Sequence, residues 1–213
     1  MVLLSLLVAC HTSSESGPLD SEGDPAVALD CPSYSGIKAG RIWTYAYTDG
    51  LGTDGVLTST LTDIDGAAGS FTWVDDVDAG DGSYHQEISC TCTAEGWFKS
   101  DEEGDWNGGW SQEYDPPLLL VPVDLSTDSS WTQVEHLTYT TAGYGAQEGD
   151  FTYNMAGGNG YTVETPVGDF DTIDVQVYIT ETTGRWDTRY ADGTGPVQTV
   201  MYPTIWTLES VTE

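Results

Sequence analysis

Carboxylates at nearly alternate positions make one segment of the sequence a candidate cation site. Asp76, Asp78 and Asp81 precede Glu87 in a segment that also contains glycine. Because hard oxygen ligands in a glycine-containing loop suit Ca²⁺, this spacing points to calcium, the one cofactor that the sequence suggests. The segment differs from an EF-hand loop, since Gly80 stands at a ligand position and Asp81 at the position of the obligatory glycine. The alternative is a solvated hairpin tip in a protein kept soluble by charge.

Two tryptophans in a glycine-rich segment are candidate ligand-stacking residues. Trp106 and Trp110 flank Asn107-Gly108-Gly109 and follow an acidic run at residues 101–105, which we expect to form a loop. Exposed aromatic side chains in such loops stack on sugar rings or anchor a partner, because they bury a large area at low entropy cost. The alternative is that at least one of the two packs into the core.

The residue types needed for catalysis do not occur in the required patterns. The three histidines, at positions 11, 85 and 136, are far apart, and no serine stands in a Gly-x-Ser-x-Gly motif. No glycine loop followed by lysine is present to bind phosphate. With 35 Asp and Glu residues, some carboxylate pair falls at a glycosidase-like separation by chance, so a hydrolase that uses such a pair is an alternative without assigned residues. We expect no catalytic residues and no enzymatic activity.

One disulfide is expected among three of the four cysteines. Thiols of exported proteins are usually oxidised, and Cys90 and Cys92 fall on the same face of a strand. A bridge between these two would be strained, so we expect Cys31 to pair with Cys90 or Cys92 and one thiol to remain free. The three positions lack a nearby histidine and make a poor zinc pattern.

The N-terminal residues suggest export and lipidation. The apolar run at residues 2–9 is too short to span a bilayer but suits the hydrophobic region of a signal peptide. Leu7-Val8-Ala9-Cys10 resembles the bacterial lipobox. The resemblance implies a signal peptide over residues 1–9, with its basic region lost upstream of Met1, and a diacylglyceryl thioether on Cys10. His11 after the cysteine favours the outer membrane or the cell surface.

Charge and composition narrow the class of protein further. The formal net charge of −30 excludes most nucleic-acid binders, which need clustered Lys and Arg to contact phosphates. The 8 Trp and 12 Tyr residues are too many for a disordered acidic chain. Residues 10–30 are rich in Ser, Gly, Pro and acids and contain no Phe, Trp or Tyr, so we expect a tether there and one β-domain over residues 31–213.

Strand signals dominate the domain. Trp43, Tyr45 and Tyr47 alternate on one face of an expected strand, and Phe71 and Trp73 repeat that pattern. Asp-Gly pairs at 54–55, 65–66 and 192–193 are typical of hairpin turns. We expect about ten to twelve strands in an antiparallel all-β fold, either a sandwich or a curled, partly open half-barrel.

Three separated stretches resemble the motifs of one family. Residues 40–45 (GRIWTY) resemble a G-x-x-W-x-Y strand. Residues 116–122, followed by Trp131-Thr132, resemble a proline-bounded apolar run that leads to a G-x-x-W-T strand. Residues 163–173 resemble a V-x-x-P-x-G-x-F-D-T-I hairpin. Together they are similar to a broad group of uncharacterised bacterial secreted and lipid-anchored β-domain proteins. Some members look like the half-barrel of the Lol lipoprotein carriers, which holds acyl chains on its concave face. The motif residues are structural, and we expect Trp43, Trp131, Phe170 and Trp206 in the core.

These observations together predict a bacterial cell-envelope lipoprotein with a non-enzymatic binding or structural role. The membrane is its expected partner through the lipid anchor, and an envelope protein, a lipid or a glycan is the expected ligand. In the main hypothesis the concave or open side of the sheet holds an apolar segment of a partner or a lipid. A carbohydrate- or calcium-binding surface protein is the first alternative, and the carboxylate-pair hydrolase is the second.

Overall fold

The computed structural model describes residues 29, 31–48, 54–80, 82–105, 108–158 and 160–213. Within these residues the fold is all-β, as predicted, with one short 3-10 helix and thirteen strands. None of the helical structure in this part of the chain has the length and apolar character needed to cross a membrane. The elements are η1 (Ser33–Ser35), β1 (Ile42–Thr48), β2 (Asp54–Asp65), β3 (Ser70–Ala79), β4 (Gly82–Cys92), β5 (Gly96–Gly104), β6 (Trp110–Pro122), β7 (Ser130–Thr141), β8 (Gly145–Gly158), β9 (Thr162–Thr165), β10 (Gly168–Ile179), β11 (Arg185–Ala191), β12 (Gly195–Met201) and β13 (Thr204–Thr212).

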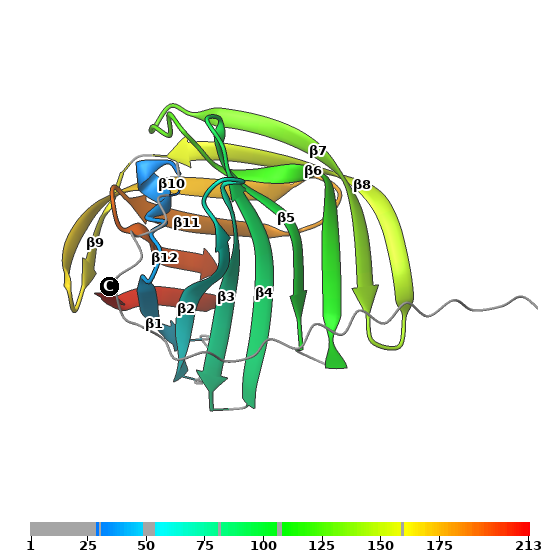
Figure 1. Ribbon diagram of the computed structural model, residues 1–213, viewed down its shortest axis with the longest axis horizontal. Coiled ribbons are helices and arrows are strands. Elements are labelled where there is room, and N and C mark those ends of the chain that lie inside the picture. Colours follow the sequence, from blue (N-terminus) through cyan, green and yellow to red (C-terminus); the bar gives the residue numbers. More distant parts are fainter. Residues whose placement is uncertain (1–28, 30, 49–53, 81, 106–107, 159) are drawn as a thin grey trace, which may run out of the picture.

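The strands form a closed antiparallel barrel. From β1 to β8, and again from β10 to β13, each strand pairs with the next along the chain, and β8 pairs with β10. Pairing of β13 with β1, from Thr212 opposite Ile42 to Ile205 opposite Thr48, closes the ring. Among the described strands only β9 stays outside it, paired with β10 (Figure 1). Of the two expected architectures the barrel is therefore the observed one, but it is closed rather than partly open, because the first and last strands satisfy each other's edges.

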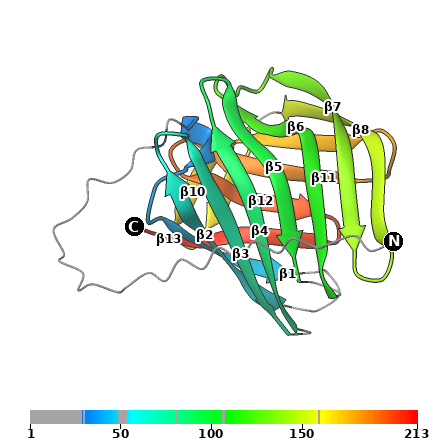
Figure 2. The ribbon, with the colours of Figure 1, turned by 45° about the vertical axis from the view of Figure 1, so that its right-hand side comes forward.

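Closure makes the concave side of the sheet, where the main hypothesis placed an apolar segment of a partner or a lipid, the interior of the barrel. The barrel has two distinct ends. The β3–β4, β5–β6, β7–β8, β10–β11 and β12–β13 connections share one end, which we call the hairpin end (Figure 2). The opposite end carries η1 and the β4–β5 and β11–β12 turns, and we call it the plugged end.

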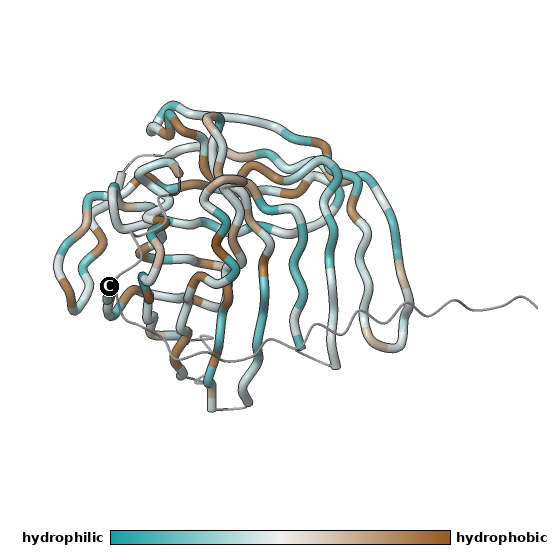
Figure 3. The backbone as a smooth tube through the Cα atoms, viewed as in Figure 1, coloured by the Kyte–Doolittle hydropathy of each residue, from teal (hydrophilic) through white to brown (hydrophobic). Residues whose placement is uncertain are grey.

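Large side chains fill the interior next to the plugged end. Trp43 from β1 stacks on Trp73 from β3 with ring centroids 4.8 Å apart, and Trp97 from β5 lies 5.5 Å beyond. Trp43 is fully buried, as predicted, whereas Trp131, Phe170 and Trp206 are only partly buried and pack against the core. Figure 3 shows that hydrophobic residues are sparse along β7 and β8 toward their hairpin. The packed core therefore occupies one part of the barrel rather than its whole length.

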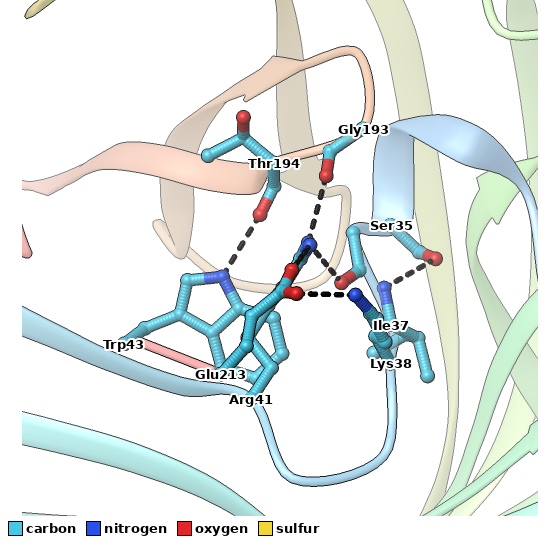
Figure 4. Close-up of polar contacts among 9 residues, drawn as sticks. Ser35, Ile37, Lys38, Arg41, Trp43, Gly193, Thr194 and Glu213 are labelled. Atoms are coloured by element: carbon cyan, nitrogen blue, oxygen red, sulfur yellow. Dashed lines mark hydrogen bonds and ion pairs between the residues drawn. The ribbon is translucent and has the colours of Figure 1, made fainter. Parts of the chain in front are cut away.

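A disulfide and a network of polar contacts hold the plugged end, and Figure 4 shows the polar contacts. A disulfide joins Cys31, before η1, to Cys92 at the end of β4, which is one of the two predicted pairings, and Cys90 is a buried free thiol. Gly36 ends η1 with φ of +65°, and a Cβ there would lie 2.2 Å from the backbone of Thr194. Only glycine allows so close an approach of η1 to the β11–β12 turn.

Candidate functional site

His85 is the centre of a polar cluster on the outer face of β3, β4 and β5. It lies opposite Asp76 in the β3–β4 register. Its Nδ1 is 2.7 Å from Oδ1 of Asp76, and its Nε2 is 3.1 Å from Oε1 of Glu87, two residues along the same strand. Hydrogen bonds with these carboxylates, first Asp76 and then Glu87, raise the pKa of His85 above its usual value. A protonated imidazole donates to both acids.

Asp105 fixes the end of β5 to the same cluster. Its Oδ1 accepts a hydrogen bond from the backbone N–H of His85 at 2.8 Å, and its own N–H donates to the His85 carbonyl at 3.1 Å. These two bonds extend the β4–β5 ladder beyond its last strand pair, Gln86 opposite Gly104. The side chain of Asp105 is thereby held beside the imidazole.

Two open hollows flank this cluster, and together we call them the His85 groove. The first has a volume of about 440 Å³ and is lined by His85, Glu87, Glu103, Gly104, Asp105, Gly109, Trp110, Ser111 and Thr140. The second has a volume of about 510 Å³ and is lined by Val56, Thr58, Asp76, Val77, Asp78, Ser83, Tyr84, His85 and Asp105. His85 and Asp105 line both hollows. The groove therefore crosses the strands from β2 to β7 near the hairpin end.

The groove brings together residues that the sequence placed in two separate candidate sites. Asp76, Asp78 and Glu87, the expected calcium ligands, line it together with the expected stacking residue Trp110. A Cβ on Gly104 would lie 2.8 Å from Nε1 of Trp110, so the indole covers this glycine. The other two predicted members, Asp81 and Trp106, lie outside the described residues, as does the expected lipidation site Cys10.

The geometry of the acids favours hydrogen bonding over metal coordination by the described side chains. Asp76 and Glu87 both turn to the imidazole of His85. In the described ranges, no group of three or more His, Cys, Asp or Glu side chains is arranged to hold a metal ion. Calcium binding by the full set that includes Asp81 stays a prediction.

One sequence interpretation at this site was wrong. The acidic run at residues 101–105 was expected to be a loop, but Asp101 to Gly104 belong to β5, and Glu102 faces the barrel interior with 8% of its surface exposed. Sequence reasoning also missed the inward-facing acids Asp75 and Glu135. Asp75 continues the Phe71 and Trp73 alternation that the sequence displays, so that pattern could have located it.

The lining of the groove determines which ligands fit it. Carboxylates and hydroxyls accept hydrogen bonds, and neither lysine nor arginine is present in the lining to bind an anion. Trp110 lines the first hollow beside them, with its indole next to Gly104. Polyhydroxylated and cationic ligands match this chemistry, whereas phosphorylated ligands do not.

Comparison with known proteins gives one distant similarity. No protein-family model and no curated protein sequence matches the chain. The chain is similar to a crystal structure at 2.70 Å of a protein described as "a putative lipoprotein" from Parabacteroides distasonis ATCC 8503, with 13% identity and a TM-score of 0.39. The match covers 86% of this chain and 100% of that one. A likeness at this level assigns neither a ligand nor an activity.

Proposed function

We propose that this chain is a lipid-anchored, non-enzymatic binding protein of the bacterial cell envelope, and that its His85 groove binds a glycan. The observation that carries the proposal is the position of Trp110 in the same open hollow as Glu87, Glu103 and Asp105. Sugar rings present an apolar face and several hydroxyl groups. An indole packs against the face, and carboxylates accept from the hydroxyls.

The other lining residues support a polyhydroxylated ligand. Ser111 and Thr140 add hydroxyls on β6 and β7. The hollow is open rather than enclosed and crosses several strands, which suits an extended chain of sugars. The acids belong to different strands of a rigid sheet, so the acceptors are preorganised and little entropy is lost on binding.

Glycan retention tests this proposal directly. The full chain is applied to an array of bacterial and plant glycans, with and without Ca²⁺, and compared with Trp110→Ala and Glu103→Gln. We expect both variants to lose retention while their melting temperatures stay close to that of the wild type. Tyr144→Ala is the matched control, because Tyr144 is 81% exposed and lies outside the groove lining.

Two results would overturn the glycan assignment. One is retention that is unchanged in Trp110→Ala, and the other is a wild-type chain that no glycan retains. Retention that requires Ca²⁺ and is lost in Asp76→Asn would add calcium to the site rather than exclude the glycan, since Asp76 lines the second hollow.

The anchor is tested separately from the groove. Cys10→Ser removes the thiol that the lipobox resemblance assigns to the lipid. We expect the variant to move from the membrane fraction to the soluble fraction of cells, because acyl chains supply the membrane affinity. Continued membrane association of Cys10→Ser would contradict the lipid anchor and leave the groove untouched.

A further inference from the structure

The barrel interior differs between its two ends. Near the hairpin end, inward-facing positions carry aromatic side chains that are only partly buried: Tyr47, Tyr84, Tyr139, Phe151, Trp186 and Trp206. Deeper positions on the same strands are closed to solvent, for example Tyr45 at 4% and Leu208 at 0% exposed. Solvent therefore reaches an aromatic mouth at the hairpin end, and barrel mouths are common places for small-ligand sites.

Acidic side chains lie among these inward-facing residues. Asp75 accepts hydrogen bonds from Oγ of Ser59 at 2.5 Å and from Nε1 of Trp73 at 2.6 Å. Glu102 accepts from Oη of Tyr114 at 2.6 Å and lies 3.1 Å from Nζ of Lys99. These two carboxylates are satisfied by the protein itself.

Glu135 is the exception. It faces inward on β7, is 0% exposed, and neither of its carboxylate oxygens has a hydrogen-bond partner. The β6–β7 ladder ends one residue away, at Asp115 opposite His136, and β6 continues with two prolines. Proline has no N–H, so β6 offers no backbone donor at this point.

The charge of the interior is unbalanced. Of the five Lys and Arg residues, all of which lie in the described part of the chain, Lys99 faces the interior and pairs with Glu102, whereas Arg41 is held at the plugged end by Gly36, Gly193 and Glu213. A buried carboxylate without a partner is costly, because it loses its hydration and gains nothing in return. Burial, and then the nearby Asp115, raise the pKa of Glu135 to about 7.

We propose that the interior at the hairpin end binds a small organic cation, whose ammonium group pairs with Glu135 and whose carbon chain packs on the aromatic mouth. Carboxylates are acceptors only, so the missing partner is a donor, and a cationic donor also corrects the local charge. Aromatic faces add cation–π attraction. Phe151 lies directly opposite Glu135 in the β7–β8 register and is only partly buried, so it is an aromatic side chain beside the carboxylate.

Butylammonium and its neutral counterpart n-butanol test this inference on the full chain. Isothermal titration at pH 6 is expected to show saturable binding of butylammonium and none of n-butanol. Glu135→Gln is expected to weaken the cation at least about tenfold, since a charge-assisted contact is lost. Glutamine has nearly the shape of protonated glutamate, so this variant is expected to retain the fold. Glu113→Gln, an exposed outward-facing position on β6, is the matched control and is expected to bind as the wild type.

Proton release gives a second readout. Below pH 7 the cation must displace the proton of Glu135, so titrations in buffers of different ionisation enthalpy are expected to show release of protons in the wild type and none in Glu135→Gln. Equal affinity of wild type and Glu135→Gln overturns the proposal, as does the absence of binding. Equal binding of n-butanol overturns the cationic choice. None of these results bears on the His85 groove, whose lining does not include Glu135.

Discussion

Arg41 lies 2.6 Å from Oε1 of Glu213, an ion pair that joins the residue before β1 to the residue after β13 (Figure 4). The same guanidinium donates to the carbonyls of Gly36 at 2.8 Å and Gly193 at 2.7 Å. It is 11% exposed. One side chain thus links the strand pair that closes the barrel to η1 and to the β11–β12 turn.

Loss of this side chain is expected to destabilise the fold. Arg41→Ala leaves three acceptors without their donor, and we expect a loss of about 1–3 kcal/mol in the free energy of unfolding. Lys38→Ala is the matched control, because Lys38 also pairs with Glu213 but is 52% exposed, and surface ion pairs contribute about 0–1 kcal/mol. Urea denaturation of both variants measures the difference. Equal effects of the two substitutions would contradict the linking role of Arg41.

The disulfide is expected to stabilise the same end. Cys31 and Cys92 are 61 residues apart in the sequence, so the bridge restricts the unfolded chain, and its removal in Cys31→Ser is expected to cost about 2–4 kcal/mol. The melting temperature of Cys31→Ser, compared with the wild type under oxidising conditions, checks this. Cys90→Ala is the control for a cysteine outside the bridge. A wild-type melting temperature in Cys31→Ser would contradict the prediction.

The sequence predicted the strands better than their closure. Alternation of Trp43, Tyr45 and Tyr47 located β1, and the Asp-Gly pairs at 65–66 and 192–193 do form turns. The pair at 54–55 instead begins β2, because its residues pair with both neighbouring strands. Pairing of β1 with β13 depends on two segments far apart in the chain, and no local pattern carries that information.

The inward position of Glu102 was hidden by irregular pairing, unlike that of Asp75, which follows a regular alternation. Shifts in register occur between Ser89 and Cys90 on β4 and between Lys99 and Asp101 on β5. Because of the second shift, Lys99 and Glu102 both face the interior although they are three residues apart, which a strict two-residue period forbids. The sequence named Asp76 and Trp110 as members of two separate sites but did not predict that both lie next to His85. Their proximity depends on the order of the strands in the barrel, which spacing along the chain does not reveal.

Stability is expected to fall as the pH rises from mildly acidic to neutral. Burial raises the pKa of Glu135 from 4.5 to about 7 and that of Asp75 from 3.8 to about 6. Between the ordinary and the raised values the folded state binds more protons than the unfolded state, so the free energy of unfolding decreases with pH. Glu135→Gln is expected to be more stable than the wild type at pH 8 and equal to it at pH 4. Denaturation curves at pH 4 and pH 8 measure the free energy of unfolding of both proteins, with Glu113→Gln as control. The prediction is contradicted if wild type and Glu135→Gln differ in this free energy by the same amount at the two pH values.

Salt is expected to stabilise the domain. Residues 31–213 contain 30 of the acids and all 5 bases, so the folded chain concentrates negative charge that the unfolded chain spreads out. At 0.1 M monovalent salt the screening length is about 10 Å, short enough to weaken repulsion between strands that are not neighbours. The exposed Lys38–Glu213 pair loses attraction at the same time, but such pairs are few beside the excess of acids. We therefore expect the melting temperature to rise between 0.01 and about 0.5 M NaCl. The rise should be the same in Glu135→Gln, because screening acts on the surface charges. A flat or falling melting temperature would mean that the acids are too far apart to repel one another.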